Sequence, residues 1–307
     1  MSMTHPRTGR PRERVLTMRG IGKRFGAVKA LTDVDFWVNE GEVVALVGDN
    51  GAGKSTLVKV LAGVHPPDSG SIEFDGEDIG IASPADAQRL GIETIFQDLA
   101  LCDNLDVVAN LWLGRELRDG ATLDEVDMEQ RTWTLLRELS AKIPSVRVPV
   151  ASLSGGQRQT VAIARSLIGE PRVVILDEPT AALGVAQTAE VLNLIERLRE
   201  RGHGVILISH NMADVMAVAD RVVVLRLGRN NGVYNVADVT SETLIAAITG
   251  AVDHSPAPRR VPERTDAAPA DPRDAEPAAD EGHGGTVIRM PHAGSRRTPR
   301  PRGDGSR

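Results

Sequence analysis

Short apolar runs alternate along the chain with segments in which apolar residues recur at helical spacing. The runs are rich in Val, Ile and Leu and cover residues 42–48, 173–177 and 204–209. Such β-branched runs are typical of central parallel strands, which are buried on both faces. Residues 185–202 show an apolar helical face and end at Gly202, a residue that commonly follows a helix. The alternation predicts an α/β fold with a parallel sheet.

Other patterns indicate further strands and a helical segment. Residues 15–25 and 30–38 predict early strands, and residues 69–76 predict a strand that ends in an Asp-Gly turn. Residues 103–139 are expected to be mostly helical, with leucines at helical spacing in their second half. Shorter expected elements are a helix at 53–64, a helix opened by Ser83 and Pro84, and a strand at 93–97.

The two ends of the chain differ from the middle in composition. Residues 251–307 hold nine of the eighteen prolines, no aromatic residue and few large apolar side chains. Such a segment cannot bury enough apolar surface to offset the entropy lost on ordering, so we expect it to be disordered. It is either a solvated extension or a regulatory or docking tail. Residues 1–13 are expected to be disordered as well, which leaves 14–250 as the folded part.

Charge is distributed unevenly. The whole chain carries −6, but its ends are positive, at +3 for residues 1–14 and +1 for residues 251–307, which leaves −10 on residues 15–250. A general nucleic-acid binder normally shows a basic face, so the acidic body argues against nucleic acid as a partner. An aromatic share of 3% argues against a binding surface built from stacked rings.

Cysteine content and hydropathy indicate in which cellular compartment the chain is expected. Cys102 is the single cysteine, which excludes a disulfide framework and a Cys-based zinc site. No apolar run approaches the roughly 20 residues needed to span a bilayer. A secretion signal has an apolar stretch after its charged residues, and the N-terminus of this chain has none. We therefore expect a soluble, cytoplasmic chain that reaches a membrane only through partners.

Residues 48–55 fit the pattern G-x-x-x-x-G-K-S between a buried strand and a helix. The glycines let backbone N–H groups surround phosphates, and the helix N-terminus adds positive potential. Lys54 would reach the β- and γ-phosphates, the Ser55 hydroxyl would ligate Mg²⁺, and Thr56 would support the α-phosphate. A chance glycine turn does not account for the strand and helix on either side. The predicted nucleotide-binding residues are Gly48, Asp49, Asn50, Gly51, Ala52, Gly53, Lys54, Ser55 and Thr56.

The apolar run at 173–177 ends in two adjacent carboxylates, Asp177 and Glu178. Asp177 can lie beside Mg²⁺ at the end of the strand, and Glu178, which points in a different direction, can polarise an attacking water. Two solvated carboxylates at a strand exit are the alternative, and the phosphate-binding motif in the same chain argues against it.

The sequence LSGGQ occupies residues 153–157, between these two motifs. Together the three motifs resemble those of the ATP-binding subunits of ABC transporters, in that family's order, over residues 15–250. The resemblance implies an α/β fold with a P-loop NTPase core of the ABC ATPase type, an antiparallel β subdomain and a helical subdomain at about 98–160. The ABC transporter ATP-binding domain would be residues 14–250.

The resemblance also implies a site shared between two copies of the chain. ATP and Mg²⁺ would bind between the phosphate-binding loop of one copy and the LSGGQ segment of the other. Because this chain has one set of motifs, the expected partner is a second copy of itself. The residues that would meet the partner's γ-phosphate are Ser154, Gly155, Gly156 and Gln157.

Three further residues take their roles from the resemblance. Gln97 matches the glutamine that contacts Mg²⁺ and water and senses the membrane subunit, so it joins Ser55 and Asp177 among the metal contacts. His210 matches the histidine that contacts the γ-phosphate, and Phe25 matches the ring that stacks on adenine. Taken alone, each has an ordinary alternative: a surface glutamine, a structural histidine and a core phenylalanine.

One position departs from the family. Gly184 stands where the loop after the two carboxylates usually ends in Asp, so a carboxylate that would cross the dimer interface is missing. The resemblance leaves open whether the backbone still connects the two sites.

The segments DEPTAALG and FQDLALCDNLDVVANLWLGRE resemble the carbohydrate-importing branch of the family. This implies import of a sugar through separate integral-membrane permease subunits, at the cytoplasmic face of the membrane, with an extracytoplasmic binding protein. Import of a nucleoside or a polyol, or a soluble non-transport ATPase, are the alternatives. The second segment is expected to form the groove for the permease. There Cys102 would pack as a small apolar residue, while Trp112 would line the groove or fill the core.

Overall fold

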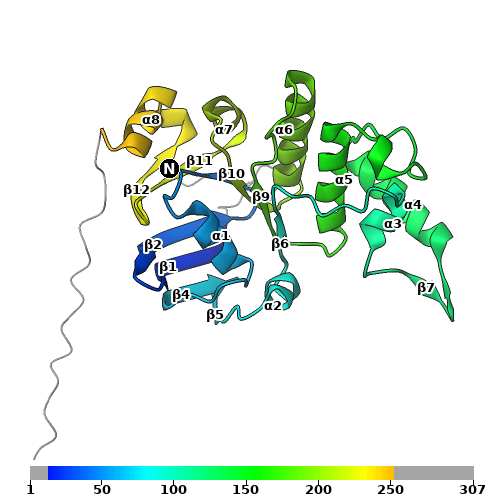
Figure 1. Ribbon diagram of the computed structural model, residues 1–307, viewed down its shortest axis with the longest axis horizontal. Helices are drawn as coiled ribbons and strands as arrows, with labels where there is room; N and C mark the ends of the chain where they lie inside the picture. Colours follow the sequence, from blue (N-terminus) through cyan, green and yellow to red (C-terminus); the bar gives the residue numbers. More distant parts are fainter. Residues whose placement is uncertain (1–12, 252–307) are drawn as a thin grey trace, which may run out of the picture. The chain divides into compact units, whose positions relative to one another are not determined.

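The apolar runs form the centre of a six-stranded sheet (Figure 1). We describe it from a computed structural model, in which residues 13–251 are described. In sheet order the strands are β12 (Arg229–Asn235), β11 (Arg221–Arg226), β3 (Val43–Val47), β10 (Gly204–Ile208), β9 (Val173–Asp177) and β6 (Ile92–Ile95). Neighbouring strands from β11 to β6 are parallel, and only β12 pairs in the antiparallel sense. The predicted α/β core with a parallel sheet is confirmed.

Both faces of the central sheet are covered. Along β3, Val43, Ala45 and Val47 pack into a core with helices, whereas Val44 and Leu46 pack into a second core with the other sheet. This explains why β3 reads as a continuous apolar run. The helices of the first core include α5 (Gly155–Leu167), α6 (Val185–Glu200), α7 (Met212–Val218) and α8 (Ser241–Thr249), and the second core includes α1 (Lys54–Leu61).

The second sheet is antiparallel and has four strands. In sheet order these are β2 (Val28–Asn39), β1 (Arg14–Phe25), β4 (Ser69–Phe74) and β5 (Glu77–Ile79). The turn between β4 and β5 is Asp75–Gly76, as the sequence predicts, and both residues have positive φ. A short helix, α2 (Pro84–Arg89), follows, with Ser83 as its N-cap. The predicted antiparallel β subdomain is confirmed.

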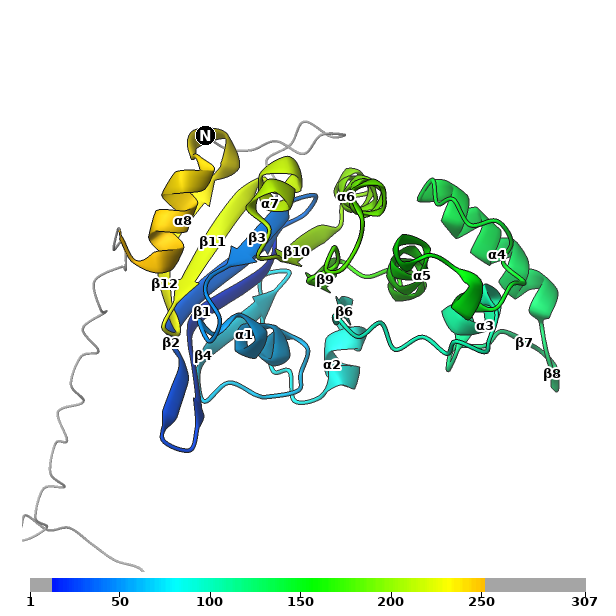
Figure 2. The ribbon, with the colours of Figure 1, turned by 45° about the horizontal axis from the view of Figure 1, so that its top comes forward.

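The helical segment contains α3 (Val107–Trp112), α4 (Glu125–Glu138) and α5, and both ribbon views place it beyond the β6 edge of the central sheet (Figures 1 and 2). The expectation of mostly helix over 103–139 needs one correction. A small hairpin, β7 (Arg118–Asp119) and β8 (Thr122–Leu123), lies between α3 and α4. The turn Gly120–Ala121 joins the paired residues Asp119 and Thr122, and Gly120 adopts the positive φ that such a two-residue turn requires.

Trp112 fills the core of this helical segment. It is 6% exposed, and its indole N–H donates to the carbonyl oxygen of Met128 and the hydroxyl of Thr132. Of the two expectations for Trp112, core packing is therefore the correct one. Cys102 is half-buried.

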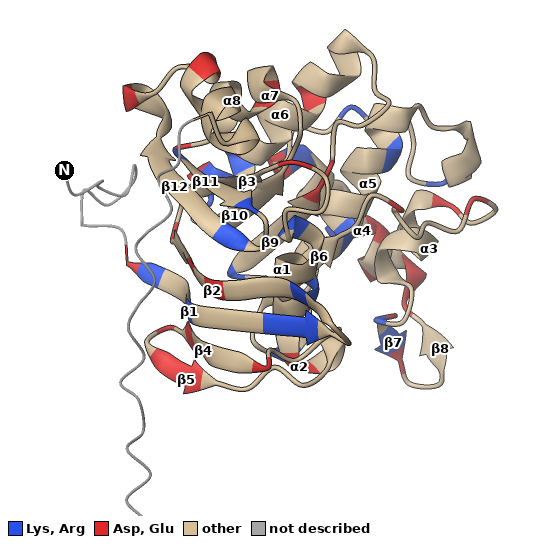
Figure 3. Cartoon of the chain, turned by 60° about the vertical axis from the view of Figure 1, so that its left-hand side comes forward, with Lys and Arg blue, Asp and Glu red and all other residues tan. Residues whose placement is uncertain are grey.

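Residues 1–13 and 251–307, expected to be disordered, lie outside the described residues except for Glu13 and Ala251. Two 3₁₀ turns, η1 (Val150–Ser152) and η2 (Val236–Asp238), complete the elements found in 13–251. None of the helices in this range has the length and apolar content to cross a membrane. In the view of Figure 3, basic and acidic segments are interspersed over both sheets.

Candidate nucleotide site

The phosphate-binding loop connects β3 to α1 and folds back on its own lysine. The Lys54 ammonium donates to the backbone carbonyls of Gly48, at 2.7 Å, and Asp49, at 3.1 Å. These two bonds hold the cation over the loop. The chain thus presents a formed loop with its positive charge at the centre.

Two glycines make this loop conformation possible. Gly48 and Gly53 have φ of 154° and 106°, where a side chain is rarely accommodated. A Cβ on Gly48 would lie 2.3 Å from the carbonyl oxygen of Leu225, and one on Gly53 would lie 2.9 Å from that of Ala30. The loop is therefore packed against the β2 and β11 backbones so closely that only glycine fits at either position.

A cavity of about 560 Å³ beside the loop brings residues of two predicted motifs together with His210. It contains Lys54 of the loop, Glu178 after β9 and His210 after β10. The carboxyl ends of neighbouring parallel strands meet at one sheet edge, which is where such folds bind ligands. The lining residues are Gly48, Asp49, Asn50, Lys54, Glu178, Ser209, His210, Met212, Ile245 and Ile248.

Within this cavity Glu178 and His210 are in contact. Glu178 Oε2 lies 2.7 Å from His210 Nδ1, with the two side chains 18% and 76% exposed. Glu178 has a φ of 52°, a left-handed conformation that is strained for a residue with a side chain. Its backbone N–H donates to the carbonyl oxygen of Ile208 at 2.9 Å, which fixes the residue against β10. The geometry aims the carboxylate at the histidine rather than at solvent.

Asp177, at the end of β9, is half-buried. Burial, and then the negative charge of Glu178, raise the pKa of Asp177 above its ordinary value, while Lys54 opposes the shift. A carboxylate in this situation gains from a nearby cation. The Ser55 hydroxyl lies in the first turn of α1. One carboxylate and one hydroxyl, completed by phosphate oxygens and water, form the kind of oxygen donor set that Mg²⁺ accepts, so these residues fit the ion.

The LSGGQ segment forms the start of α5. The Ser154 hydroxyl accepts from the Gln157 N–H and the Gln157 side-chain oxygen accepts from the Ser154 N–H, which is a capping box. A Cβ on Gly155 would lie 3.0 Å from the side chain of Leu183, and one on Gly156 would lie 3.0 Å from that of Gln187. This end of α5 therefore packs tightly against the loop before α6 and against the first turn of α6. Within residues 13–251, two cavities contain residues of the phosphate-binding loop, and neither of them includes a residue of 153–157.

Two other predicted residues also lie outside these cavities. Phe25 ends β1 and is 43% exposed, with its ring edge against His65 at a centroid distance of 5.2 Å. It is therefore not a core residue. Gln97 follows β6 in an exposed loop. Next to the phosphate-binding loop, a second cavity of about 460 Å³ is lined by Val28, Lys29, Ala30, residues 50–56, Leu227 and Gly228.

The structure adds contacts that the motifs do not reveal. The Thr180 hydroxyl donates to the Asp214 carboxylate at 2.7 Å, which ties the segment after Glu178 to the first turn of α7. Ile245 and Ile248 of α8 form an apolar wall of the cavity that contains Glu178. No signal in the sequence marks either feature, because each depends on packing between segments far apart in the chain.

Comparison with known proteins places the chain in a family. Residues 31–181 match the model of the ABC transporter family. Over 215 residues the chain is 46% identical to a xylose/arabinose import ATP-binding protein of Sulfolobus acidocaldarius. The aligned residues cover 70% of this chain and 86% of that protein. The chain belongs to the ABC transporter family. As an ATP-binding protein of this family it is an ATPase.

This ABC ATPase has further relatives of two lengths. It is 45% identical over 247 residues to the fructose import ATP-binding protein of Rhizobium meliloti, across 78% of this chain and 95% of that protein. It is also 43% identical to a ribose import ATP-binding protein of Rubrobacter xylanophilus, across 80% of this chain but 49% of that longer protein. The chain thus spans about half the length of such a longer relative.

Solved structures support the same fold. A crystal structure of a nucleotide-free ATP-binding cassette from an ABC transporter aligns with this ABC ATPase at a TM-score of 0.65 and 26% identity, over 77% of this chain and 95% of that one. A dimeric cassette in a post-hydrolysis state, bound to ADP and Pi, aligns at 0.61 and 25% identity, over 72% and 98%. The predicted fold class, an ABC-type P-loop ATPase, is confirmed.

Proposed function

We propose that this ABC ATPase hydrolyses ATP to drive import of a sugar through a separate membrane permease. The observation that carries the proposal is the single cavity that joins the Lys54 loop to the Glu178–His210 pair. The names of the relatives, which refer to xylose, arabinose, fructose and ribose import, support a sugar as the cargo.

The chemistry follows from the positions of these side chains. The phosphate-binding loop and Lys54 would bind the phosphates, and Ser55, Asp177 and Gln97 would hold Mg²⁺, which supplies charge neutralisation on the phosphates when bound. Glu178 would accept a hydrogen bond from the attacking water and polarise it for in-line attack on the γ-phosphorus. His210, in contact with Glu178, would orient that carboxylate and donate to the γ-phosphate. Phe25 would stack on the adenine.

The complete site needs a second copy of the chain. The residues 154–157 cap a helix whose N-terminus is suited to an anion, yet they line neither loop cavity of their own chain. Presented to a partner, they would close its γ-phosphate site. In place of the usual aspartate, Gly184 offers only its backbone, whose N–H donates to Gln187 at 3.4 Å. We therefore expect weak side-chain communication between the two sites.

The permease would bind on the side of the exposed Gln97 loop, beside the helical subdomain, and hold the ATPase at the cytoplasmic face of the membrane. An extracytoplasmic sugar-binding protein would deliver the cargo to the permease. Cargo contacts would then lie in those other subunits.

Reconstitution tests this function. The ATPase is co-purified with its permease, inserted into liposomes and assayed for phosphate release with the binding protein and a panel of pentoses, hexoses, nucleosides and polyols. We expect sugar-dependent stimulation, which Glu178→Gln abolishes. Stimulation by nucleosides or polyols alone would show that the cargo is wrong. Hydrolysis without any permease association would overturn the transport function while leaving the ATPase intact.

A further inference from the structure

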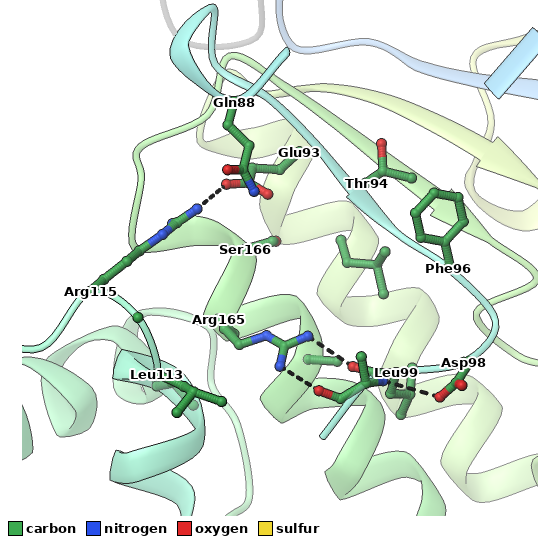
Figure 4. A pocket seen from close by; sticks show the side chains of 15 residues that line it. Gln88, Glu93, Thr94, Phe96, Asp98, Leu99, Leu113, Arg115, Arg165 and Ser166 are labelled. Carbon is green, nitrogen blue, oxygen red and sulfur yellow. Dashed lines mark hydrogen bonds and ion pairs between the residues drawn. The ribbon is translucent and has the colours of Figure 1, made fainter. Parts of the chain in front are cut away.

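A cavity of about 390 Å³ lies between the Gln97 loop and the helix that begins with the LSGGQ segment (Figure 4). One wall is β6 with the loop after it, and another is α5, through Ala162, Arg165 and Ser166. The segment after α3 completes the cavity with Leu113, Gly114 and Arg115. The cavity therefore touches both the segment that would sense the permease and the helix that would act on the partner's ATP.

Arg165 connects these two segments directly. Its guanidinium donates to the backbone carbonyls of Leu99, at 2.9 Å, and Ala100, at 2.8 Å (Figure 4). One side chain of α5 thus binds two successive peptide groups of the loop. The planar fork of Arg is suited to such paired acceptors, and a lysine could not reproduce both bonds in the same geometry.

Arg165 is attracted by the charge of Glu93 but does not contact it. Within residues 13–251 it forms no ion pair, and burial lowers its pKa. The other arginine of the cavity differs, because Arg115 pairs with Glu93 at 2.6 Å. Hydrogen bonds from a charged donor are stronger than neutral ones, especially where water is partly excluded. The two loop carbonyls are therefore the groups that satisfy Arg165, and the loop position is coupled to this side chain.

The side chains of Leu99 and Leu101 pack against the first core, and Arg165 binds the backbone of Leu99 and Ala100. Residues 96–101 form no helix or strand, and Ala100 adopts a φ of 49°, which is unfavourable for a residue with a side chain. Inside the loop, the Ala100 N–H donates to the Asp98 carboxylate at 3.2 Å. Residues 96–98 and Ala100 are exposed, and an irregular, exposed segment opens more easily than a buried helix or strand. Its attachment to Arg165 is the link through which such a movement would reach α5.

Helix α5 can carry a movement to its far end. Arg165 is eleven residues after Ser154, which corresponds to roughly 16 Å along a helix. Most of the helix is buried, and its N-terminal glycines pack closely against Leu183 and the first turn of α6. Because it is continuous from Gly155 to Leu167, a shift at Arg165 would reorient the capped residues 154–157 as one body.

We infer that Arg165 is a positioning residue that couples the Leu99–Ala100 loop to the LSGGQ helix. A permease segment bound in the cavity displaces the loop, and Arg165 transfers that displacement to the residues offered to the partner copy. This inference rests on the proposed function, because it requires a permease that binds at this cavity.

The test compares Arg165→Gln and Arg165→Lys with the wild type in the reconstituted complex. Gln keeps a polar side chain but removes the charge and the paired donors, while Lys keeps the charge. Basal ATPase of the free subunit and its affinity for ATP are expected to stay near wild type. Stimulation by the permease is expected to fall about fivefold or more with Gln, the lower end of usual coupling factors, and less with Lys. Arg131→Gln, at an exposed pair with Asp127 on α4, is the matched control.

Hydrogen exchange supplies a second readout that does not depend on turnover. In the wild-type complex, permease binding is expected to change amide exchange both at 98–101 and at 154–158, whereas in Arg165→Lys the change is confined mainly to 98–101. This readout also decides the matter if Arg165→Gln does not fold. Normal stimulation in Arg165→Gln, or a wild-type exchange response in Arg165→Lys, overturns the inference alone. A wild-type complex that shows no stimulation removes the proposed function, and the inference with it.

Discussion

Replacing Glu178 with Gln separates a chemical role of the Glu178–His210 contact from a structural one. Gln has nearly the same shape, and its amide oxygen can still accept from His210 Nδ1 across the 2.7 Å contact. The histidine is 76% exposed, and exposed ion pairs contribute about 0–1 kcal/mol to stability. We therefore expect the free energy of unfolding to change by less than about 1 kcal/mol, and the melting temperature by only a few degrees at most.

The expected effect on turnover is much larger. An amide cannot polarise the attacking water as a carboxylate does, and positioned general bases contribute about 10²–10⁴-fold to a rate. At 1.36 kcal/mol per tenfold change, this corresponds to about 3–5 kcal/mol of activation free energy. A loss of that size cannot come from the small change in stability.

The assay measures phosphate release, ATP affinity and oligomeric state in parallel. Glu178→Gln is expected to bind ATP with Mg²⁺ and to persist as a dimer on size-exclusion chromatography, because ATP remains intact. Glu138→Gln is the matched control, since it also removes a carboxylate from an ion pair, with Arg201 at 2.6 Å, on the surface of α4. Near-normal phosphate release by Glu178→Gln would refute the assignment and point to another base.

Three further expectations follow from the site. Phe25→Ala should weaken ATP binding by about 1–3 kcal/mol, the usual value of base–aromatic stacking; an unchanged Kd in titration calorimetry would assign the ring to packing with His65 instead. Because folding raises the pKa of Asp177, the stability tied to its protonated form is lost as the pH rises from 3.8 through the higher folded value. Asp177→Asn should therefore melt at a higher temperature than wild type at pH 7 without nucleotide, and a lower one would contradict the buried-charge argument. Mixing Lys54→Ala with Ser154→Arg places both lesions in one site of the mixed dimer, so part of the ATPase activity should return; a verified mixed dimer that binds no ATP would exclude the shared site.

The fold was largely predictable because its central strands are buried on both faces. A strand that is buried on both faces consists of apolar residues without interruption, as β3 and β9 do. Each run is only five residues long, a length that favours a strand over a helix. The hairpin of β7 and β8 was missed because each strand has two residues and lies between helices. A pattern of period two cannot be established over so short a length.

Some features of the site could likewise be predicted from the sequence and others could not. Residues that follow buried strands, such as Glu178 and His210, could be predicted because the carboxyl ends of parallel strands meet. The bond between Thr180 and Asp214 joins residues 34 positions apart, and a sequence without its tertiary packing does not show it. The same holds for Arg165, whose partners are loop carbonyls that every residue type possesses.

The apolar wall contributed by α8 bears on how selectively this nucleotide site can be inhibited. The phosphate-binding loop offers backbone N–H groups, which any chain with this motif presents in a similar way. A compound that binds only the loop has little by which to tell one such ATPase from another. Met212, Ile245 and Ile248 offer side chains in the same cavity. A compound that spans the loop and these three residues would therefore draw its selectivity mainly from α7 and α8, two helices that carry none of the family's motifs.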